Sequence, residues 1–319
     1  MNATEQASTA PGYDYGLYGL RLRSPRPLPF LRPIPPDAGK EANVEIRFAP
    51  VALCKEPVVQ SSPFSSIHAD GTIVLTRPEG VRVLIEGGRC LTVDAAADLT
   101  EAELHTWLFG PAMMMLCHQR GTPPLHASVI EIGGQGVAIA GDAGAGKSTT
   151  ARALMKRGHR LLTDDQAIVD PESRLVHPGY PAMKLWDSAA VAFGDAVDGR
   201  LRVKRGFAKF FRPLGEDFHP DPVPLALVLV LKTVPGAAAP VVEAQPPIAA
   251  AAALLHRHLS GPGVARALDR GRAAFQWTTA LAPRVPVRIL RRPDDLARLD
   301  ALCDAIGDLV RSVAKGNRA

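Results

Sequence analysis

The segment GDAGAGKSTT, residues 141–150, constrains this chain most. It fits the pattern G-x-x-x-x-G-K-[ST] and stands between the apolar run GVAIA (136–140) and the helical stretch KSTTARALMKRG (147–158). Such a loop turns backbone N–H groups around phosphate oxygens, and the positive end of the helix dipole faces the anion. A glycine turn that merely starts a helix is the weaker alternative. The residues predicted to bind the nucleotide are Gly141, Ala143, Gly144, Ala145, Gly146, Lys147, Ser148 and Thr149.

Two aspartates are expected beside this loop. The helix of residues 147–157 is about 16 Å long, and the strand HRLLT (159–163) climbs back roughly the same length. A right-handed crossover makes this strand parallel to GVAIA, so Asp164 and Asp165 end level with the loop. Carboxylates there can ligate Mg²⁺ or accept a proton from a hydroxyl, whereas a solvated turn is the plainer alternative. ATP and Mg²⁺ are the expected cofactors, with Lys147 on the β- and γ-phosphates and Ser148 on the metal.

His126 is predicted to stand at the mouth of the loop. The strands ASVIEI (127–132) and GVAIA are joined by a tight glycine turn suited to a hairpin. If Ile132 pairs with Gly136, counting outward places His126 opposite Asp142. A proton-handling or polarising role and a purely structural, hydrogen-bonded role are equally open for this histidine.

The rest of the chain suggests three parts. Residues 1–96 hold short strand-like runs and are predicted to form a small β-rich domain, with a proline-dense extended surface segment at 24–40. Residues 97–124 are expected to form a connecting helix, with Thr100 and Glu103 as a capping box and Gly121 ending it. Residues 125–319 alternate strands and helices and are predicted to be an α/β catalytic domain with a P-loop.

Composition indicates a cytoplasmic protein. The net charge of +5 gives no reason to expect nucleic-acid binding, and the four cysteines form no CxxC pair. The first residues lack the features of a signal peptide. The apolar run LFGPAMMMLC (108–117) is about half of the ~20 residues that a membrane span needs, so no membrane contact is expected.

Residues 125–170, from LHASVIEI through the loop and RGHRL to TDDQAIV, resemble the catalytic core of the HPr kinase/phosphorylase family. The likeness implies an α/β P-loop kinase fold of HPr-kinase type that transfers the γ-phosphoryl group of ATP to a serine of a peptide or small protein. By resemblance, Asp164 is the general base supported by His126, and Ser148 with Asp165 holds Mg²⁺. Oligomerisation is left open.

The family's EIRG-type segment is missing; YPAMKLWDSAA (180–190) stands in its place. The resemblance therefore does not extend to HPr as substrate, to the reverse phosphorylase reaction or to a hexamer. The N-terminal YGLRLRSPRPLPFL (18–31) instead resembles shorter HPr-kinase-like proteins that act on lasso precursor peptides. That likeness implies the C-terminal serine of such a peptide as the acceptor. A kinase of free serine or another small molecule, and a nucleotide-dependent switch without an acceptor, are the alternatives.

Two further segments carry open interpretations. RLRVKRGFAKFFRP (200–213) holds six basic residues and no acids, with phenylalanines at helical spacing. It is either a lid that grips phosphate or an acidic peptide, or a solvated basic face. In HPGYPAMKLW (177–186), Tyr180, Lys184 and Trp186 either line a substrate pocket or anchor a loop.

Overall fold

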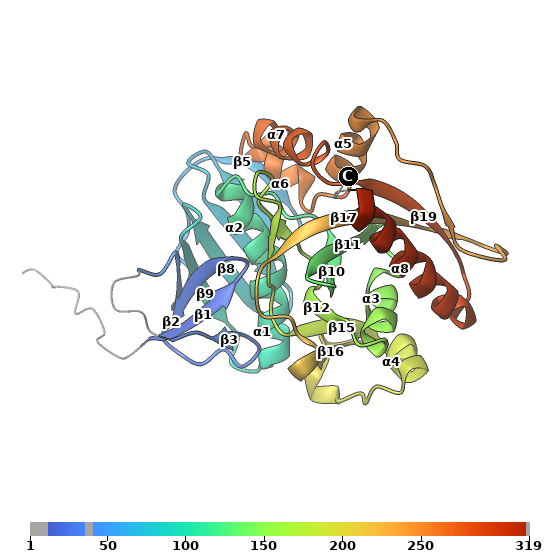
Figure 1. Cartoon of the computed structure of the whole chain (residues 1–319). Helices are drawn as coiled ribbons and strands as arrows, with labels where there is room; N and C mark the ends of the chain where they lie inside the picture. Colours follow the sequence, from blue (N-terminus) through green and yellow to red (C-terminus); the bar gives the residue numbers. More distant parts are fainter. Residues whose placement is uncertain (1–11, 36–40, 317–319) are drawn as a thin grey trace, which may run out of the picture.

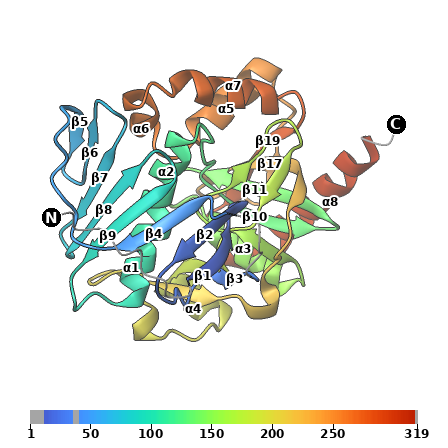
Figure 2. The same cartoon turned by 90° about the vertical axis from the view of Figure 1, so that its left-hand side faces the viewer.

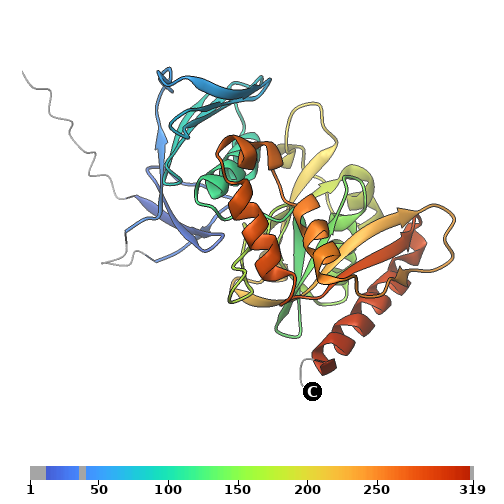
Figure 3. The same ribbon diagram turned by 90° about the horizontal axis from the view of Figure 1, so that it is seen from above.

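The computed structural model describes residues 12–35 and 41–316, which build a mixed α/β fold around two large sheets (Figure 1). Strands from the first ninety-five residues form one sheet, and strands from residue 127 onward form the other. The helical segment after residue 100 lies between them, and Figure 3 shows the two halves side by side. The division of the chain into domains stays a prediction. Residues 1–11, 36–40 and 317–319 of the predicted domains lie outside the described residues.

The N-terminal sheet has nine strands in the order β3-β1-β2-β4-β9-β8-β7-β6-β5 (Figure 2). Its alternating pattern produces a one-sided core: in VRVLIE, Val81, Val83 and Ile85 are fully buried while the residues between them are not. The predicted surface segment 24–40 differs in part, because Leu28 and Leu31 are buried in this core. The strands are β1 Tyr13–Leu17, β2 Leu20–Ser24, β3 Arg32–Pro33, β4 Val44–Phe48, β5 Val58–Ser62, β6 Ser65–His68, β7 Ile73–Arg77, β8 Val81–Glu86 and β9 Cys90–Ala95.

The predicted connecting helix is present but is interrupted by a π-helical turn. It consists of α1 (Glu101–Trp107), η1 (Leu108–Ala112) and α2 (Met113–Gln119). Thr100 and Glu103 form the expected capping box. Pro111 inside η1 cannot donate a helical hydrogen bond, which accounts for the widened turn. The apolar run at 108–117 is buried against the N-terminal sheet, and no helix in the described part of the chain is long and apolar enough to cross a bilayer.

The second sheet lies between two helical layers. Its main path runs β12-β10-β11-β17-β14-β13, and β19 pairs with β17 and β18. One face packs on α3 (Lys147–Lys156) and α8 (Leu299–Gly316), and the other on α5 (Ile248–Arg257) and α7 (Gly271–Leu281) (Figures 1 and 3). The strands are β10 Ala127–Ile132, β11 Gln135–Gly141, β12 Arg160–Thr163, β13 Ile168–Val169, β14 Leu175–His177, β17 Val223–Val234, β18 Val241–Val242 and β19 Val287–Pro293.

The remaining elements are a separate hairpin and short helices. The hairpin pairs β15 (Ala182–Trp186) with β16 (Lys209–Pro213). The phenylalanines of residues 200–213 therefore do not lie on a helix: Phe210 and Phe211 are on β16, after the short 3₁₀ turn η2 (Gly199–Leu201). The other short helices are α4 Asp187–Phe193, η3 Gly215–Asp217, α6 Pro262–Ala267 and η4 Leu296–Arg298.

The register of the β10–β11 hairpin differs by one residue from the prediction. Ile132 pairs with Gln135 instead of Gly136, because the turn has only two residues, Gly133 and Gly134. Both have positive φ, 60° and 79°, as a type I′ turn requires. Strand β12 runs parallel to β11, as expected, but β10 lies between them and is antiparallel to both.

A buried ion pair fixes α3 against the hairpin. Arg152 on α3 donates to Asp195 from Nε at 2.7 Å and Nη2 at 2.5 Å, and Arg212 on β16 donates to the same carboxylate at 3.2 Å. Both Arg152 and Asp195 side chains are largely shielded from water. Burial works to raise the pKa of Asp195, but the bonds and charges of the two arginines outweigh it and lower that pKa.

We expect Asp195→Asn to lower the free energy of unfolding by about 3 kcal/mol at pH 7, because it leaves a buried guanidinium without its counter-charge. A lowered carboxylate pKa stabilises the fold above the unfolded pKa of about 3.9 and ceases to do so as pH falls through the folded value. The difference between variant and wild type should therefore hold at neutral pH and shrink below about pH 4. Urea unfolding measures it. Asp198→Asn, which removes the exposed pair with Arg200, is the control and should change nothing measurable.

Candidate active site

The glycine-rich loop lies between β11 and α3, as predicted. Gly146 is the N-cap residue of α3 with φ 88°, in the left-handed region that favours glycine. A β-carbon there would lie 2.6 Å from Nη2 of Arg292, and one at Gly141 would lie 2.9 Å from the Leu231 carbonyl oxygen. Neither position has room for a side chain. Because α3 begins directly after the loop, its first-turn N–H groups and its positive dipole end face the space around the loop.

Lys147 is buried and bonded to the loop itself. Its Nζ donates to the carbonyl oxygens of Gly141 at 2.9 Å and Asp142 at 3.2 Å. Burial lowers the pKa of Lys147, and the nearby charges of Asp165 and Asp164 partly offset that effect. An ammonium held only by neutral carbonyls in a half-closed site is well placed to exchange them for an anion.

Asp164 is buried behind the loop with both carboxylate oxygens occupied. Oδ1 accepts from Ser128 Oγ at 2.7 Å and from Ser148 Oγ at 3.3 Å, and Oδ2 accepts from the Lys184 backbone N–H at 3.0 Å. The serine expected to hold Mg²⁺ thus contacts Asp164, whereas the sequence-based assignment paired Ser148 with Asp165. Ser128 has no counterpart in the predicted site.

Asp165 faces the cavity and is paired with a lysine. Its Oδ2 accepts from Lys184 Nζ at 2.8 Å, and its backbone has φ 67°, which is uncommon for a residue other than glycine. Burial works to raise the pKa of Asp165, but the positive charges of Lys184 and Lys209 outweigh it, so the pKa is well below its usual value. The carboxylate is therefore ionised throughout the physiological range.

His126 lies beside this aspartate. Its Nδ1 is 2.9 Å from the Asp165 carbonyl oxygen. Because a carbonyl oxygen only accepts, Nδ1 carries a proton and donates it to this bond. The bond thus joins the histidine to the residue whose backbone has the unusual positive φ.

One cavity of about 280 Å³ brings most of the predicted residues together. Gly141, Ala145 and Asp164 are buried and do not line it, whereas Lys184, Trp186 and Lys209 of the β15–β16 hairpin do. Tyr180 is buried and packs on His105 and does not reach the cavity. The lining residues are His126, Ala143, Gly144, Gly146, Lys147, Ser148, Thr149, Asp165, Lys184, Leu185, Trp186, Ala189 and Lys209.

Two supporting contacts come from parts of the chain that the sequence did not connect with the loop. Arg292 on β19 is buried and donates from Nε to the Ala145 carbonyl oxygen at 2.9 Å. Gln166, just after the aspartates, donates to the Gly110 carbonyl oxygen in the π-helical turn at 2.7 Å. A β-carbon at Gly110 would lie 3.9 Å from Lys184 Nζ, so this turn also packs beside the lysine.

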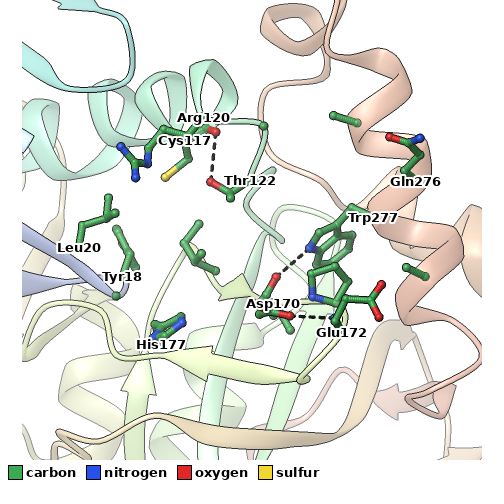
Figure 4. Close-up of a pocket in the computed structure, with 17 residues that line it drawn as sticks. Tyr18, Leu20, Cys117, Arg120, Thr122, Asp170, Glu172, His177, Gln276 and Trp277 are labelled. Atoms are coloured by element: carbon green, nitrogen blue, oxygen red, sulfur yellow. Dashed lines mark hydrogen bonds between the residues drawn. The ribbon is translucent and has the colours of Figure 1, made fainter. Parts of the chain in front are cut away.

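A larger cavity of about 470 Å³ lies elsewhere, between the β1–β2 turn, α2 and α7 (Figure 4). None of the loop residues lines it. Its polar groups are largely used within the protein: Trp277 Nε1 donates to the Val169 carbonyl oxygen at 2.8 Å, and Asp170 accepts from the backbone N–H of Glu172. This cavity is therefore separate from the one that holds the loop and Asp165.

The segment that carries the loop is similar to a known protein family. Residues 121–182 match the family model described as the HPr Serine kinase C-terminal domain. Over this segment the chain is HPr kinase-like. That stretch contains β10 to β12, the loop, α3 and both aspartates, which are the elements that build most of the cavity.

The curated relatives extend over the same short region. The chain is 46% identical over 57 residues to the HPr kinase/phosphorylase of Enterococcus faecalis, covering 18% of each chain. It is 57% identical over 42 residues to that of Pediococcus pentosaceus, covering 13% of this chain and 14% of the relative. The chain thus matches less than a fifth of either relative's length. The solved Hpr(Ser) kinase/phosphatase of Coxiella burnetii aligns with 61% of this chain and 92% of its own, at 16% identity and a TM-score of 0.32.

Among the residues that the structure describes, no group of three or more His, Cys, Asp and Glu side chains is arranged to hold a metal ion. Ser148 nevertheless lines the cavity and offers a hard oxygen ligand of the type that Mg²⁺ prefers, and Asp164 behind it accepts from that hydroxyl, as an outer-shell partner of a metal ligand does. Mg²⁺ keeps several waters and usually takes its other ligands from substrate phosphates. The residues present therefore fit a magnesium ion that arrives with a nucleotide.

Proposed function

We propose that this protein is an ATP-dependent kinase that transfers the γ-phosphoryl group to a serine hydroxyl of a peptide or small protein. The observation that carries the proposal is the ionised Asp165 carboxylate facing the same cavity as the glycine-rich loop. Phosphoryl transfer asks little of a protein beyond positioning, charge neutralisation and an acceptor for one proton. The likeness to HPr kinases over residues 121–182 supports the same reaction.

In this proposal the loop residues Gly141 and 143–149 hold the phosphates, with Lys147 on the β- and γ-phosphates. Ser148 would ligate Mg²⁺ and Asp164 would orient that hydroxyl from behind; the ion would neutralise phosphate charge. Asp165 is the general base. The structure thus favours exchanging the roles expected for the two aspartates, because Ser148 contacts Asp164 and only Asp165 reaches the cavity.

In the chemical step, one bond forms, one bond breaks and one proton is transferred. The serine oxygen forms a bond to the γ-phosphorus, and the bond from that phosphorus to the bridging oxygen of ADP breaks. The hydroxyl proton passes to Asp165 and then to water. Since the proton leaves late in a loose transition state, a carboxylate of low pKa suffices. Lys184 orients Asp165, and His126 holds its backbone.

The finer form of the proposal names the acceptor as the C-terminal serine of a lasso precursor peptide. Its support is the resemblance of residues 18–31 to lasso-associated proteins of this type and the absence of the EIRG-type segment. We also propose that the protein is cytoplasmic and that its partner is a peptide or a small protein.

Labelled ATP with Mg²⁺ and defined acceptors tests the proposal. We expect label to pass from the γ-position to a peptide ending in serine and to be absent from the same peptide ending in alanine. Equal or faster labelling of free serine would replace the peptide acceptor with a small molecule. ATP binding with no labelled acceptor and no ADP linked to an acceptor would contradict the kinase and favour a nucleotide-dependent switch.

A further inference from the structure

The basic stretch, residues 200–213, has one lysine that forms no salt bridge with the described part of the chain. Five of its six basic side chains have partners within the chain, and Lys209 has no ion pair within residues 12–35 and 41–316. Instead, Lys209 lines the same cavity as the glycine-rich loop. The partnered residues are Arg200 with Asp198, Arg202 with the Phe207 carbonyl oxygen, Lys204 with Glu79, Arg205 with Asp98 and Glu103, and Arg212 with Asp195 and Asp217.

An exposed aromatic pair continues from this lysine toward the outside. Trp186 is directly opposite Lys209 in the β15–β16 hairpin and lines the same cavity. Its ring stacks on Phe207 with centroids 6.4 Å apart, and the two residues are 51% and 43% exposed. The ammonium of Lys209 is 5.8 Å from the Trp186 ring centroid, and that of Lys204 is 3.8 Å from the Phe207 centroid. We call Trp186, Phe207 and Lys209 the hairpin rim.

The position of the hairpin rim beside the cavity determines which part of a substrate can contact it. The glycine-rich loop, which we propose holds the nucleotide phosphates, lines one cavity together with Asp165 and the hairpin residues Trp186 and Lys209. An acceptor hydroxyl that reaches Asp165 therefore has hairpin side chains beside its neighbouring groups. Exposed aromatic rings suit a peptide backbone and side chains, and an ammonium without a salt bridge suits a carboxylate.

We propose that the hairpin rim binds the acceptor and that the acceptor is a peptide with a carboxylate, from an acidic side chain or its own C-terminus, beside the reacting serine. This inference rests on the proposed function, because it names the substrate class of the same site. Lys209 sets the charge preference, and Trp186 with Phe207 contacts the chain beside the serine.

Tryptophan fluorescence tests binding without any reaction. The chain has three tryptophans, of which Trp107 and Trp277 are buried, so acrylamide quenching reports mainly Trp186. With a non-hydrolysable ATP analogue present, an acidic serine peptide should protect the fluorescence from acrylamide, and the same peptide with lysines for its acids should not. Trp186→Phe should abolish the protected signal. Quenching that no peptide alters would overturn the rim.

A charge exchange at Lys209 tests specificity. We expect wild type to prefer acidic over lysine-flanked peptides by about tenfold or more in kcat/KM, and Lys209→Glu to reverse that order. Arg200→Glu changes the same charge in the same stretch at an exposed residue away from the cavity, and should keep the wild-type order. An equal loss for all peptides in Lys209→Glu would place this lysine on the nucleotide phosphates and overturn the inference.

The two proposals fail in different ways. Peptide protection of Trp186 without phosphoryl transfer would leave the rim standing and remove the kinase. Transfer to serine peptides with neither charge preference nor protection would leave the kinase standing and remove the rim.

Discussion

Replacing Asp165 with asparagine is expected to slow phosphoryl transfer by roughly 10²–10⁴-fold while ATP still binds. The substitution removes the charge and the proton acceptor that face the cavity, and leaves the size of the side chain unchanged. Asparagine also tolerates the left-handed backbone of residue 165, where alanine would add strain. Single-turnover transfer to a serine peptide, together with calorimetric ATP binding, measures the two effects separately.

Asp164→Asn separates the two aspartates. Because Asp164 contacts Ser148, this variant should raise the Mg²⁺ concentration needed for half-maximal activity by about tenfold or more, whereas Asp165→Asn should leave it near that of wild type. Asparagine at 164 also turns a donor toward one of the groups that now donate to the carboxylate, so its stability is measured alongside. Full activity in Asp165→Asn, with activity lost in Asp164→Asn at unchanged Mg²⁺ dependence, would restore the assignment made from the sequence.

Replacing Lys147 with methionine is the second change with a large expected effect. It removes the ammonium bonded to the Gly141 and Asp142 carbonyl oxygens, which we propose is released to the β- and γ-phosphates. Loss of one charged group from such a cradle typically costs 10²–10³-fold in rate, and we expect weaker ATP binding as well.

Lys156→Met is the matched control, since Lys156 is exposed at the opposite end of the same helix. Calorimetry with ATP and steady-state kinetics should show a wild-type control and an impaired Lys147 variant. Wild-type ATP affinity and rate in Lys147→Met would show that the phosphates do not lie on this loop.

The sequence predicts this site well where the chain is continuous. Residues 125–170 hold a hairpin, a glycine loop, a helix and a returning strand, and element lengths alone bring the aspartates level with the loop. The structure has α3 beginning at Lys147, and Ser148 within 3.3 Å of Asp164. Local pattern and chain length determine these features, so they could be found without coordinates.

The detailed geometry of the site depends on backbone conformations that the sequence pattern does not reveal. A two-residue turn at Gly133 and Gly134 shifts the hairpin register by one residue. Asp165 has a left-handed backbone conformation, and the two adjacent aspartates differ: Asp164 is buried, whereas Asp165 faces the cavity. Strand alternation alone could not predict which aspartate faces the cavity.

The sequence pattern also does not predict contacts between distant segments. Arg292 reaches Ala145 across 147 residues of chain, and Gln166 reaches back 56 residues to Gly110. Lys209 was hidden in a charge run whose phenylalanine spacing suggested a helix, although residues 209–213 form a strand. Only the tertiary fold shows which one of six basic side chains faces the cavity.

The most direct test of the central claim is a structure of the protein with Mg²⁺ and a non-hydrolysable ATP analogue. A base within hydrogen-bond reach of a hydroxyl that attacks at near-contact distance implies about 5–6 Å from the Asp165 carboxylate to the γ-phosphorus. We expect that distance, with the phosphates on residues 141–149. A nucleotide bound elsewhere, or a separation of about 12 Å or more, would contradict the account.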